Sequence, residues 1–381
     1  MNNTELMDNE GGRFESCRGH HHSCLIVLDQ SSLTVVCHLS MMKFMIDHPS
    51  FFFSETVSNR LGSGPVYCIG RAGMDLYPEP IGANTEDAEY FRADMGGSAG
   101  NIAVALAQQG GHAALVTVFS DDQVGRFVQA KCNQYGVDIT FCQTQSGLYR
   151  NSLAIAETKP QNAGVVIYRN DAADLQISEK DIQRLDFSRA GGLLITGTAM
   201  SGEPSASAVS IAIAAARQVG CPVIFDIDYR ATAWLDAAAA ASRMRPKLAQ
   251  ADILVGNNDE FTVMYGGDEA KGFAAARAHA ETGQLVLYKR GELGCISLYQ
   301  EHMIDTGIFP VTLAKPFGAG DAFLGNFLNR LSLDGDVHAA VLRGSAAAAY
   351  VVARVGCASA MPDKQQLDDF MLSHEIKKLN N

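Results

Sequence analysis

The stretch Lys315-Pro316-Phe317-Gly318-Ala319-Gly320-Asp321-Ala322-Phe323 decides how this chain is interpreted, because a glycine-rich turn leads directly into an apolar helix. Phe323, Phe327 and Leu331 follow at four-residue steps, the spacing of one helix face. This order places free backbone N–H groups and the positive end of a helix dipole beside the carboxylate of Asp321. We expect an anion to bind there. Since a carboxylate repels an anion, we interpret Asp321 as a base for phosphoryl transfer.

The same turn has a structural alternative, an ordinary glycine-rich loop with an aspartate cap. No GxxxxGK[ST] phosphate loop occurs in the sequence, and no complete GxGxxG follows the first predicted strand. The predicted anion site is therefore neither of the Walker type nor of the dinucleotide-binding type, and a Rossmann-type dehydrogenase is disfavoured.

The composition fits a large folded domain and excludes several classes of partner. Of the 381 residues, 47% are hydrophobic and 19% are charged. The net charge of −12 argues against nucleic acid and anionic membranes as partners. No apolar run approaches the roughly 20 residues that span a bilayer. Nine cysteines without a CxxC pair indicate reduced thiols, and we expect a cytoplasmic protein.

Residues 1–62 have no sustained hydrophobic period and differ from the rest of the chain. We expect a disordered extension, or a start codon assigned too early, with Met42 and Met45 as alternative starts. Cys17, Cys24 and the histidines at 20–22 do not match the spacing of a standard zinc site. The folded domain is predicted to cover residues 63–375.

Strands and helices alternate along this domain, which indicates an α/β fold with a mostly parallel sheet covered on both faces. Ligands of such sheets bind beyond the carboxyl ends of the strands. The segments 76–95 and 141–175 interrupt the alternation and are expected to form a small antiparallel lid. The predicted strands are 66–70, 113–119, 192–196, 222–228, 253–256 and 285–289, and the helices between and after them include 101–109, 124–135, 206–219, 271–282, 337–352 and 364–378.

A second glycine motif, Met95-Gly96-Gly97-Ser98-Ala99-Gly100-Asn101, precedes an alanine-rich helix. Paired glycines allow the backbone to approach a ligand closely, and Asn101 has an amide for a ligand hydroxyl. A tight turn with a helix cap is the structural alternative.

The early GG-x-x-x-N and the late GAGD, about 220 residues apart, resemble the two signatures of the ribokinase-like (PfkB) carbohydrate kinases. The resemblance extends over residues 66 to about 372. It implies a ribokinase-like three-layer sandwich with a mostly parallel central sheet and a small β-lid, which often forms a homodimer contact. It also implies ATP and Mg²⁺ as cofactors. Gly318, Ala319 and Gly320 would form an anion hole, and Asp321 would be the catalytic base.

Other polar residues acquire roles through the same resemblance. Asp75 would bind sugar hydroxyls together with Gly96, Gly97 and Asn101; alternatively, Asp75 is a turn residue. Asn257 and Glu260, an N-x-x-E motif, would organise Mg²⁺ through water near the nucleotide phosphates. The alternative for Glu260 is a carboxylate stabilised at a helix start. The ATP phosphates would be met by a further set, namely Lys289, Gly291 and Gly294.

Two arginines point to an acidic sugar, since arginine suits bidentate recognition of a carboxylate. They are Arg169, in the predicted lid, and Arg230, at a strand end; surface ion pairs are the alternative. The segments 70–77, 172–174 and 315–317 resemble the family members that phosphorylate 5-dehydro-2-deoxygluconate in inositol breakdown. Kinases of 2-keto-3-deoxygluconate are the closely similar alternative. A non-catalytic sugar-acid-binding protein is the alternative of a different class.

Lys315 departs from the family pattern, in which many members have an aspartate that helps to bind a monovalent cation. We hypothesise that the ammonium of Lys315 replaces that cation, so that activity does not require potassium.

Overall fold

The computed structural model describes residues 6–7, 13–14 and 50–377. The chain divides into the units Met1–Pro49 and Ser50–Asn381. Within the first unit, the described residues are two short strands, β1 (Leu6–Met7) and β2 (Arg13–Phe14), which pair antiparallel. The cysteines and histidines at 17–24 and the alternative starts Met42 and Met45 lie outside the described residues.

The larger unit begins at Ser50, before the expected domain start at residue 63. Phe51 and Phe53 are buried, and the backbone N–H of Phe53 donates to Gly335 O at 2.9 Å. Helix α2 (Glu55–Leu61) follows and buries Leu61 in the same core. The phenylalanine run, which lacks any period in the sequence, is therefore an apolar anchor of the fold.

The central sheet has eight strands in the order β16-β15-β14-β13-β12-β11-β3-β6, and the prediction of a mostly parallel sheet is confirmed. The six strands from β14 to β6 pair in parallel. At the other edge, β15 pairs antiparallel with both β14 and β16. Most of their side chains are buried on both sides, as is usual for parallel strands covered by helices. The strands are β3 (Val66–Ile69), β6 (Ala113–Val116), β11 (Gly192–Thr196), β12 (Val223–Asp226), β13 (Ile253–Asn257), β14 (Leu285–Lys289), β15 (Cys295–Tyr299) and β16 (His302–Thr306).

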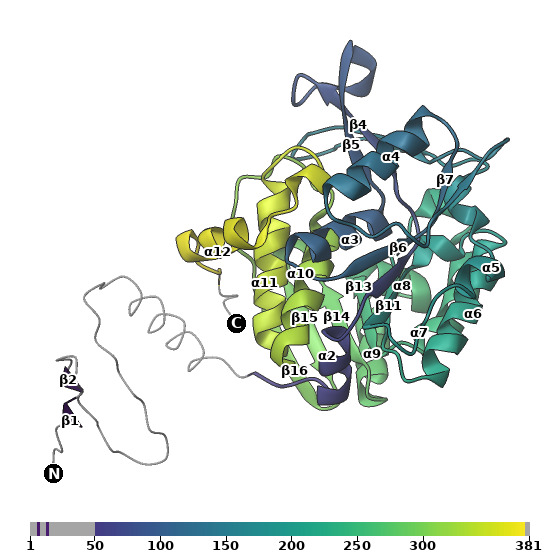
Figure 1. Ribbon diagram of the computed structural model, residues 1–381. Coiled ribbons are helices and arrows are strands. Elements are labelled where there is room, and N and C mark those ends of the chain that lie inside the picture. Colours follow the sequence, from purple (N-terminus) through teal and green to yellow (C-terminus); the bar gives the residue numbers. More distant parts are fainter. Residues whose placement is uncertain (1–5, 8–12, 15–49, 378–381) are drawn as a thin grey trace. The chain divides into compact units, whose positions relative to one another are not determined.

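Helices cover both faces of this sheet and form two apolar cores (Figure 1). One core contains residues of α2, α3 (Ser98–Gln108), α4 (Gln123–Gln134), α10 (Ala319–Asp334), α11 (Val337–Val352) and α12 (Lys364–Ser373). The other contains residues of α5 (Glu179–Ile182), α6 (Ser205–Gln218), α7 (Ala237–Leu248), α8 (Asn258–Tyr265) and α9 (Glu269–Glu281). Among the described helices, none combines the length and the apolar character that crossing a membrane requires.

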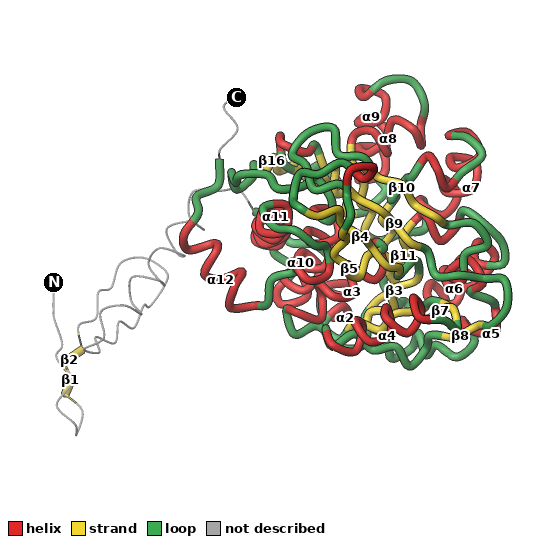
Figure 2. The backbone as a smooth tube through the Cα atoms, turned by 90° about the horizontal axis from the view of Figure 1, so that it is seen from above, coloured by secondary structure: helices red, strands yellow, loops and turns green. Residues whose placement is uncertain are grey.

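A second sheet of four strands, in the order β10-β9-β4-β5, is built from the two predicted lid segments (Figure 2). Its strands are β4 (Gly73–Glu79), β5 (Tyr90–Gly96), β9 (Leu153–Ala156) and β10 (Val165–Tyr168). The expectation of an antiparallel lid is corrected in one respect, because β4 and β9 pair in parallel. The chain makes β6 and α4 between these strands and then returns in the same direction.

Short elements complete the chain. Strands β7 (Val118–Ser120) and β8 (Gln143–Gln145) pair in parallel, so the predicted strand 113–119 is divided between two sheets. The 3₁₀ helices are η1 (Thr85–Asp87), η2 (Ala173–Gln176), η3 (Gly197–Met200), η4 (Ala231–Ala233), η5 (Gly291–Leu293) and η6 (Ala358–Ala360).

Candidate active site

The N-terminus of α10 has the features of an anion hole. Gly318 is its N-cap and has φ +82°, a left-handed conformation that favours glycine. A Cβ at Gly318 would lie 3.1 Å from Cys357 Sγ, so the turn is also tightly packed. The first N–H groups of the helix have no intrahelical acceptor. A Cβ at Gly320 would lie 3.3 Å from Lys289 Nζ, so an ammonium group adds its charge beside these N–H groups.

Asp321 lies in the first turn of α10, where Asn101 Nδ2 donates a hydrogen bond of 2.8 Å to its Oδ2. This contact joins the two sequence motifs. Removal from water raises the pKa of Asp321 to about 7, with a further contribution from the charge of Asp228. The bond from Asn101 and the charge of Arg230 oppose this effect. A carboxylate that titrates near neutrality is suited to general base catalysis.

Asp75 lies buried on β4, with an acceptor free for a ligand. Its Oδ2 accepts from Tyr77 OH at 3.2 Å, whereas its Oδ1 is buried and has no hydrogen-bond partner within the described part of the chain. Asn101 Oδ1 is in the same situation. Buried acceptors without partners are costly, and a sugar hydroxyl would satisfy them.

Gly96 and Gly97 create the space for this arrangement. A Cβ at Gly96 would lie 2.1 Å from the Asp75 carboxylate, and one at Gly97 would lie 2.5 Å from Arg71 O. Gly97 has φ +96° and is the N-cap of α3. The close approach expected of the paired glycines is thus an approach to protein groups of the site.

Charged groups gather beyond the carboxyl ends of β12, β13 and β14. Lys289 Nζ lies 3.6 Å from Asp226 Oδ1. Burial raises the pKa of Glu260 to about 7, an effect that Lys289 opposes and Asp226 reinforces. Asp228 accepts from Thr198 Oγ1 at 2.9 Å. Asp226, Glu260 and Lys289, which lie at or just after strand ends, therefore form one cluster of interacting charges.

The N-x-x-E motif forms a capping box at the start of α8. Asn257 Oδ1 accepts from Glu260 N at 2.8 Å, and Glu260 Oε2 accepts from Asn257 N at 2.7 Å. Glu260 Oε1 accepts from Tyr229 N at 3.1 Å. Both carboxylate oxygens are therefore occupied in part, which fits a contact with Mg²⁺ through water. Within the described ranges, no three His, Cys, Asp or Glu side chains gather as a preformed metal site.

The two glycines after Lys289 differ in their surroundings. Gly294 has φ +82°, and a Cβ there would lie 2.0 Å from Thr306 O, so packing against β16 accounts for its glycine. Gly291 has φ +56° and faces open space. A contact of either residue with ATP remains a prediction.

A small cavity is lined by three arginines, including the two that the sequence analysis selected. Arg169 is largely committed to protein groups, because it is paired with Asp174 and donates to Ser201 Oγ and Thr198 O, both at 3.0 Å. Arg230 Nε lies 3.0 Å from Asp228 Oδ1. The full lining is Arg71, Ser98, Ile167, Arg169, Thr198, Asp228, Arg230, Thr232 and Ala233.

Arg71 is the third arginine of this lining, and the sequence analysis did not select it as a site residue. Its Nη1 donates to Ser152 Oγ at 3.2 Å, which is the one hydrogen bond of its guanidinium within the described part of the chain. Four of its five N–H donors are left for a ligand. The available signal was its position directly after the first strand, where α/β proteins bind ligands.

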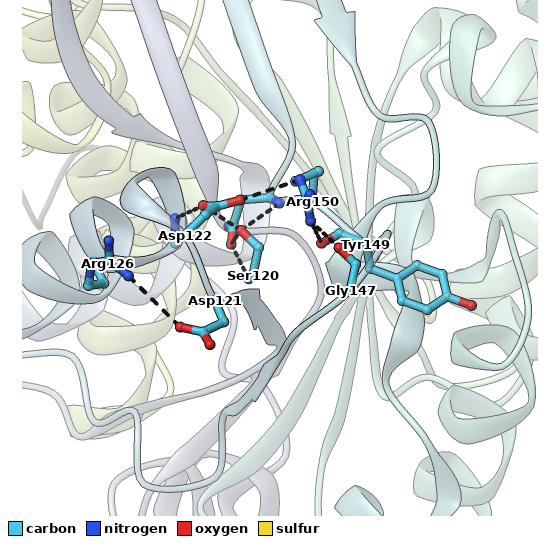
Figure 3. A network of polar contacts seen from close by, with 9 residues as sticks. Ser120, Asp121, Asp122, Arg126, Gly147, Tyr149 and Arg150 are labelled. Atoms are coloured by element: carbon cyan, nitrogen blue, oxygen red, sulfur yellow. Dashed lines mark hydrogen bonds and ion pairs between the residues drawn. The ribbon is translucent and has the colours of Figure 1, made fainter.

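A polar network that includes Ser120, Asp122 and Arg150 lies at the base of the lid (Figure 3). Asp122 caps α4 and accepts from Ser120 Oγ at 2.9 Å, and Arg150 lies 3.7 Å from it. Asn151 accepts from Ser120 N at 2.7 Å and donates to Ala72 O at 2.9 Å. The chain entering β9 is therefore tied to the end of β3, beside Ser152 and Arg71.

Solved structures share this architecture. A fructokinase from Vibrio cholerae O395, crystallised with fructose, ADP and a potassium ion, has a TM-score of 0.72 and 23% identity over 81% of this chain and 99% of its own. A putative ribokinase II from E. coli, in complex with ATP and Mg²⁺, has a TM-score of 0.73 and 20% identity over 82% of this chain and 100% of its own. At these identities the likeness establishes the fold.

Sequence relatives extend the likeness. A 5-dehydro-2-deoxygluconokinase from Photobacterium profundum is 35% identical over 81% of this chain and 94% of its own length. The Bacillus subtilis protein of the same name is 30% identical over 80% of this chain and 95% of its own. The family model for pfkB family carbohydrate kinases matches residues 65–364. The chain therefore belongs to the pfkB family of carbohydrate kinases.

Proposed function

We propose that this kinase transfers the γ-phosphoryl group of ATP to 5-dehydro-2-deoxy-D-gluconate and forms its 6-phosphate, a step of inositol catabolism. The observation that carries the proposal is the position of Asp321 at the N-terminus of α10, held by Asn101 and flanked by Lys289. The names of the curated relatives supply the substrate.

The reaction follows from these groups. Asp321 takes the proton of the primary hydroxyl, and that oxygen bonds to the γ-phosphorus as the bond to the β–γ bridging oxygen breaks. The N–H groups of Gly318, Ala319 and Gly320, with the ammonium of Lys289, stabilise charge on the transferring group. Asn101 keeps the carboxylate aimed at the hydroxyl. The lid excludes water and limits hydrolysis of ATP.

The residues present fit Mg²⁺ and ATP. Glu260 would hold a water ligand of the ion, and Asn257 keeps Glu260 in place. Mg²⁺ usually retains several waters and binds to nucleotide phosphates with few protein ligands. When bound, the ion neutralises phosphate charge during transfer. Lys289, Gly291 and Gly294 belong to the strand and turn expected to meet the phosphates.

Arg71 and Arg230 are the better candidates for the substrate carboxylate. Arg169, proposed for that role from the sequence, has most of its donors occupied by Asp174, Ser201 and Thr198. Arg71 has free donors at the cavity, and Arg230 has an exposed side chain beside it. Arg169 then serves to hold the end of β10 against η3. Asp75 accepts a sugar hydroxyl through Oδ1.

The surroundings of Lys315 support the hypothesis that its ammonium replaces a monovalent cation. Lys315 is fully buried, and its Nζ donates to Phe317 O, in the turn that forms the anion hole. A backbone carbonyl near a buried positive charge is the environment that a potassium ion would also occupy. Activity without added potassium is the expected consequence.

The lid offers a surface for a homodimer. Phe91, Val166 and Tyr168 are exposed on the same face of the small sheet, between 37% and 56% of their surface. This face is opposite to the one that carries Asp75. A second copy of the chain would bury this apolar face.

We expect the enzyme to act in the cytoplasm on ATP and a small sugar acid, without nucleic acid or membrane partners.

The direct test is a coupled assay of ADP formation with ATP, Mg²⁺ and a panel of sugars. The highest kcat/KM is expected for 5-dehydro-2-deoxygluconate, with 2-keto-3-deoxygluconate, ribose and fructose as comparisons. A higher value for another panel member would reassign the substrate. Binding without turnover, measured by fluorescence of Trp234, the single tryptophan, would instead indicate a non-catalytic binder.

A further inference from the structure

A chain of buried polar side chains connects the sugar site with the anion hole. Tyr77 OH lies 3.2 Å from Asp75 Oδ2 and 3.2 Å from Cys357 Sγ. Cys357 Sγ lies 3.9 Å from Lys315 Nζ, and Lys315 donates to Phe317 O. Tyr77, Cys357 and Lys315 are each at most 3% exposed, so water does not compete for these bonds.

The hydrogen bonds of this series can all point in one direction, from Lys315 toward Asp75. A hydroxyl has one proton, and the carboxylate of Asp75 is a stronger acceptor than a thiol, so Tyr77 donates to Asp75. The thiol of Cys357 can then donate to the Tyr77 oxygen, and the Lys315 ammonium can donate to the sulfur. A cation stands at one end and a carboxylate at the other. Each such bond polarises the next in a low-dielectric interior.

The burial of Lys315 calls for this compensation. A charged amine removed from water is costly unless it is paired and hydrogen-bonded. The described residues give Lys315 no direct ion pair, and its side-chain partners are Phe317 O and Cys357 Sγ. Burial raises the pKa of Asp75, and the charge of Arg71, the hydrogen bond from Tyr77 and the charge of Lys315 oppose this effect. Asp75 is therefore one of the opposite charges that Lys315 senses, at the far end of the hydrogen-bonded series.

The same hydrogen-bonded series also contacts the anion hole, at the peptide between Phe317 and Gly318. A planar trans peptide points its C=O and N–H in opposite directions. Because Lys315 holds the carbonyl of Phe317, the N–H of Gly318 in the same peptide is turned away from Lys315. Cys357 additionally packs against Gly318, 3.1 Å from the position of a Cβ there.

Cys357 is fixed from the lid side as well. Asp94 Oδ2 accepts from Cys357 N at 2.9 Å, and from Ser359 N and Oγ at 3.1 and 2.8 Å. Asp94 on β5 is the register partner of Asp75 on β4. Two neighbouring strands of the lid therefore hold the segment that supports the anion hole.

We infer that Tyr77 is a positioning residue which, through Cys357 and Lys315, ties the sugar-binding Asp75 to the Phe317–Gly318 peptide of the anion hole. This inference rests on the proposed kinase function. Its consequence is that sugar affinity and the rate of phosphoryl transfer depend on one shared network. Loss of a hydrogen bond in the chain should affect both.

The test uses Tyr77→Phe, Lys315→Met and the double variant. Tyr288→Phe is the matched control, because Tyr288 is equally buried and its hydroxyl has no hydrogen-bond partner within the described residues. We expect Tyr77→Phe to raise the Kd for the sugar acid about tenfold, the size expected for a lost bond to a charged group. We expect Tyr77→Phe also to lower kcat, and Lys315→Met to lower kcat more than it raises the Kd for the sugar acid. The double variant should lose less than the product of the two single effects.

The pH dependence of sugar affinity separates positioning from a structural role. Tyr77→Phe removes a bond that favours the charged form of Asp75, so the acidic loss of affinity should move to higher pH. Tm measurements on each variant identify any that do not fold. If another variant does not fold, the pH dependence of sugar affinity in Tyr77→Phe is by itself the test of the inference.

Three results would overturn the inference: a Tyr77→Phe enzyme that behaves like Tyr288→Phe, an unshifted pH profile, or effects that multiply in the double variant. A wild-type enzyme that phosphorylates no keto sugar acid would contradict the proposed substrate instead. The same four variants would then be compared with the sugar that the enzyme does accept.

Discussion

Asn101 Nδ2 donates a hydrogen bond of 2.8 Å to Asp321 Oδ2, and the two residues are 220 positions apart in the sequence. The bond joins the first turns of α3 and α10, each of which begins at a glycine with positive φ. Among the described residues Asn101 Oδ1 has no hydrogen-bond partner, so Asn101 can orient the base and accept from the substrate at once. The following predictions depend on this arrangement.

Replacing Asp321 with asparagine should abolish most turnover and leave ATP binding nearly intact. Asparagine keeps the shape and can still accept from Asn101, but it cannot take a proton. A loss of kcat of roughly 10²–10⁴-fold is expected for a general base. Steady-state rates and the Kd for ATP would check this, and near-normal turnover would remove Asp321 from the role of base.

The same variant should be more stable than the wild type above pH 7. The pKa of Asp321 is about 7 in the folded protein and ordinarily 3.8, so the folded state holds the proton more tightly. This carboxyl's contribution to stability is therefore greatest at low pH and is lost as pH rises through 7. Asp321→Asn should raise Tm at pH 8 by at least about 2 °C. An equal gain at pH 8 and at pH 4 would contradict this origin.

The rate should fall in acid with an apparent pKa near 7. Protonation of Asp321 removes the base, and Glu260 titrates in the same range. Asp228→Asn removes a charge that raises the pKa of Asp321, so the acidic limb of kcat/KM should move to lower pH. A profile of Asp228→Asn that coincides with the wild type would show that Asp228 does not influence the base.

Replacing Arg71 with methionine should raise the KM for the keto sugar acid about 10- to 100-fold, since a charge-assisted bond to the carboxylate is lost. KM for ATP should not change. Arg217→Met is a suitable control, because that arginine forms a half-exposed ion pair with Asp252. A neutral sugar such as fructose should lose no affinity with the Arg71 variant. Equal losses for both sugars would argue against recognition of a carboxylate.

The wild-type enzyme should have the same activity in potassium chloride and in choline chloride at equal ionic strength. By our hypothesis the ammonium of Lys315, which donates to Phe317 O, takes the place of an added monovalent cation. In Lys315→Ala the buried amine is removed, and potassium should restore part of the activity. A strong potassium dependence of the wild type would contradict the hypothesis.

The sequence predicted the fold well where local pattern and burial agree. The parallel strands were recognisable as short apolar runs, and Val337–Val352 was predicted with the bounds of α11. The packed start at Phe51 was missed because three consecutive phenylalanines have no period. The parallel pairing of β4 with β9 was missed because register between distant strands is set by tertiary contacts.

The candidate site was predicted less completely, because it too depends on contacts between residues that are distant in the sequence. Glycine turns and strand ends indicate where ligands bind, and the structure brings Asp321, Asn101 and Lys289 together at such a place, while their roles stay predictions. How many donors an arginine has free depends on neighbours such as Asp174 and Ser152, which no spacing indicates. Arg169 was therefore selected from the sequence, and Arg71 was not considered for this role. The chain from Asp75 to Lys315 could not be foreseen, because Cys357 joins it from near the C-terminus.

The position of β3 in the centre of the sheet has a consequence for synthesis on the ribosome. β3 is made first among the sheet strands, yet its neighbour β11 begins at Gly192 and the base on α10 is made only at Asp321. A nascent or prematurely terminated chain therefore lacks the helix end that would hold phosphate. Such fragments should therefore transfer no phosphoryl group, and we expect activity only after α10 has been made and has packed against the rest of the fold.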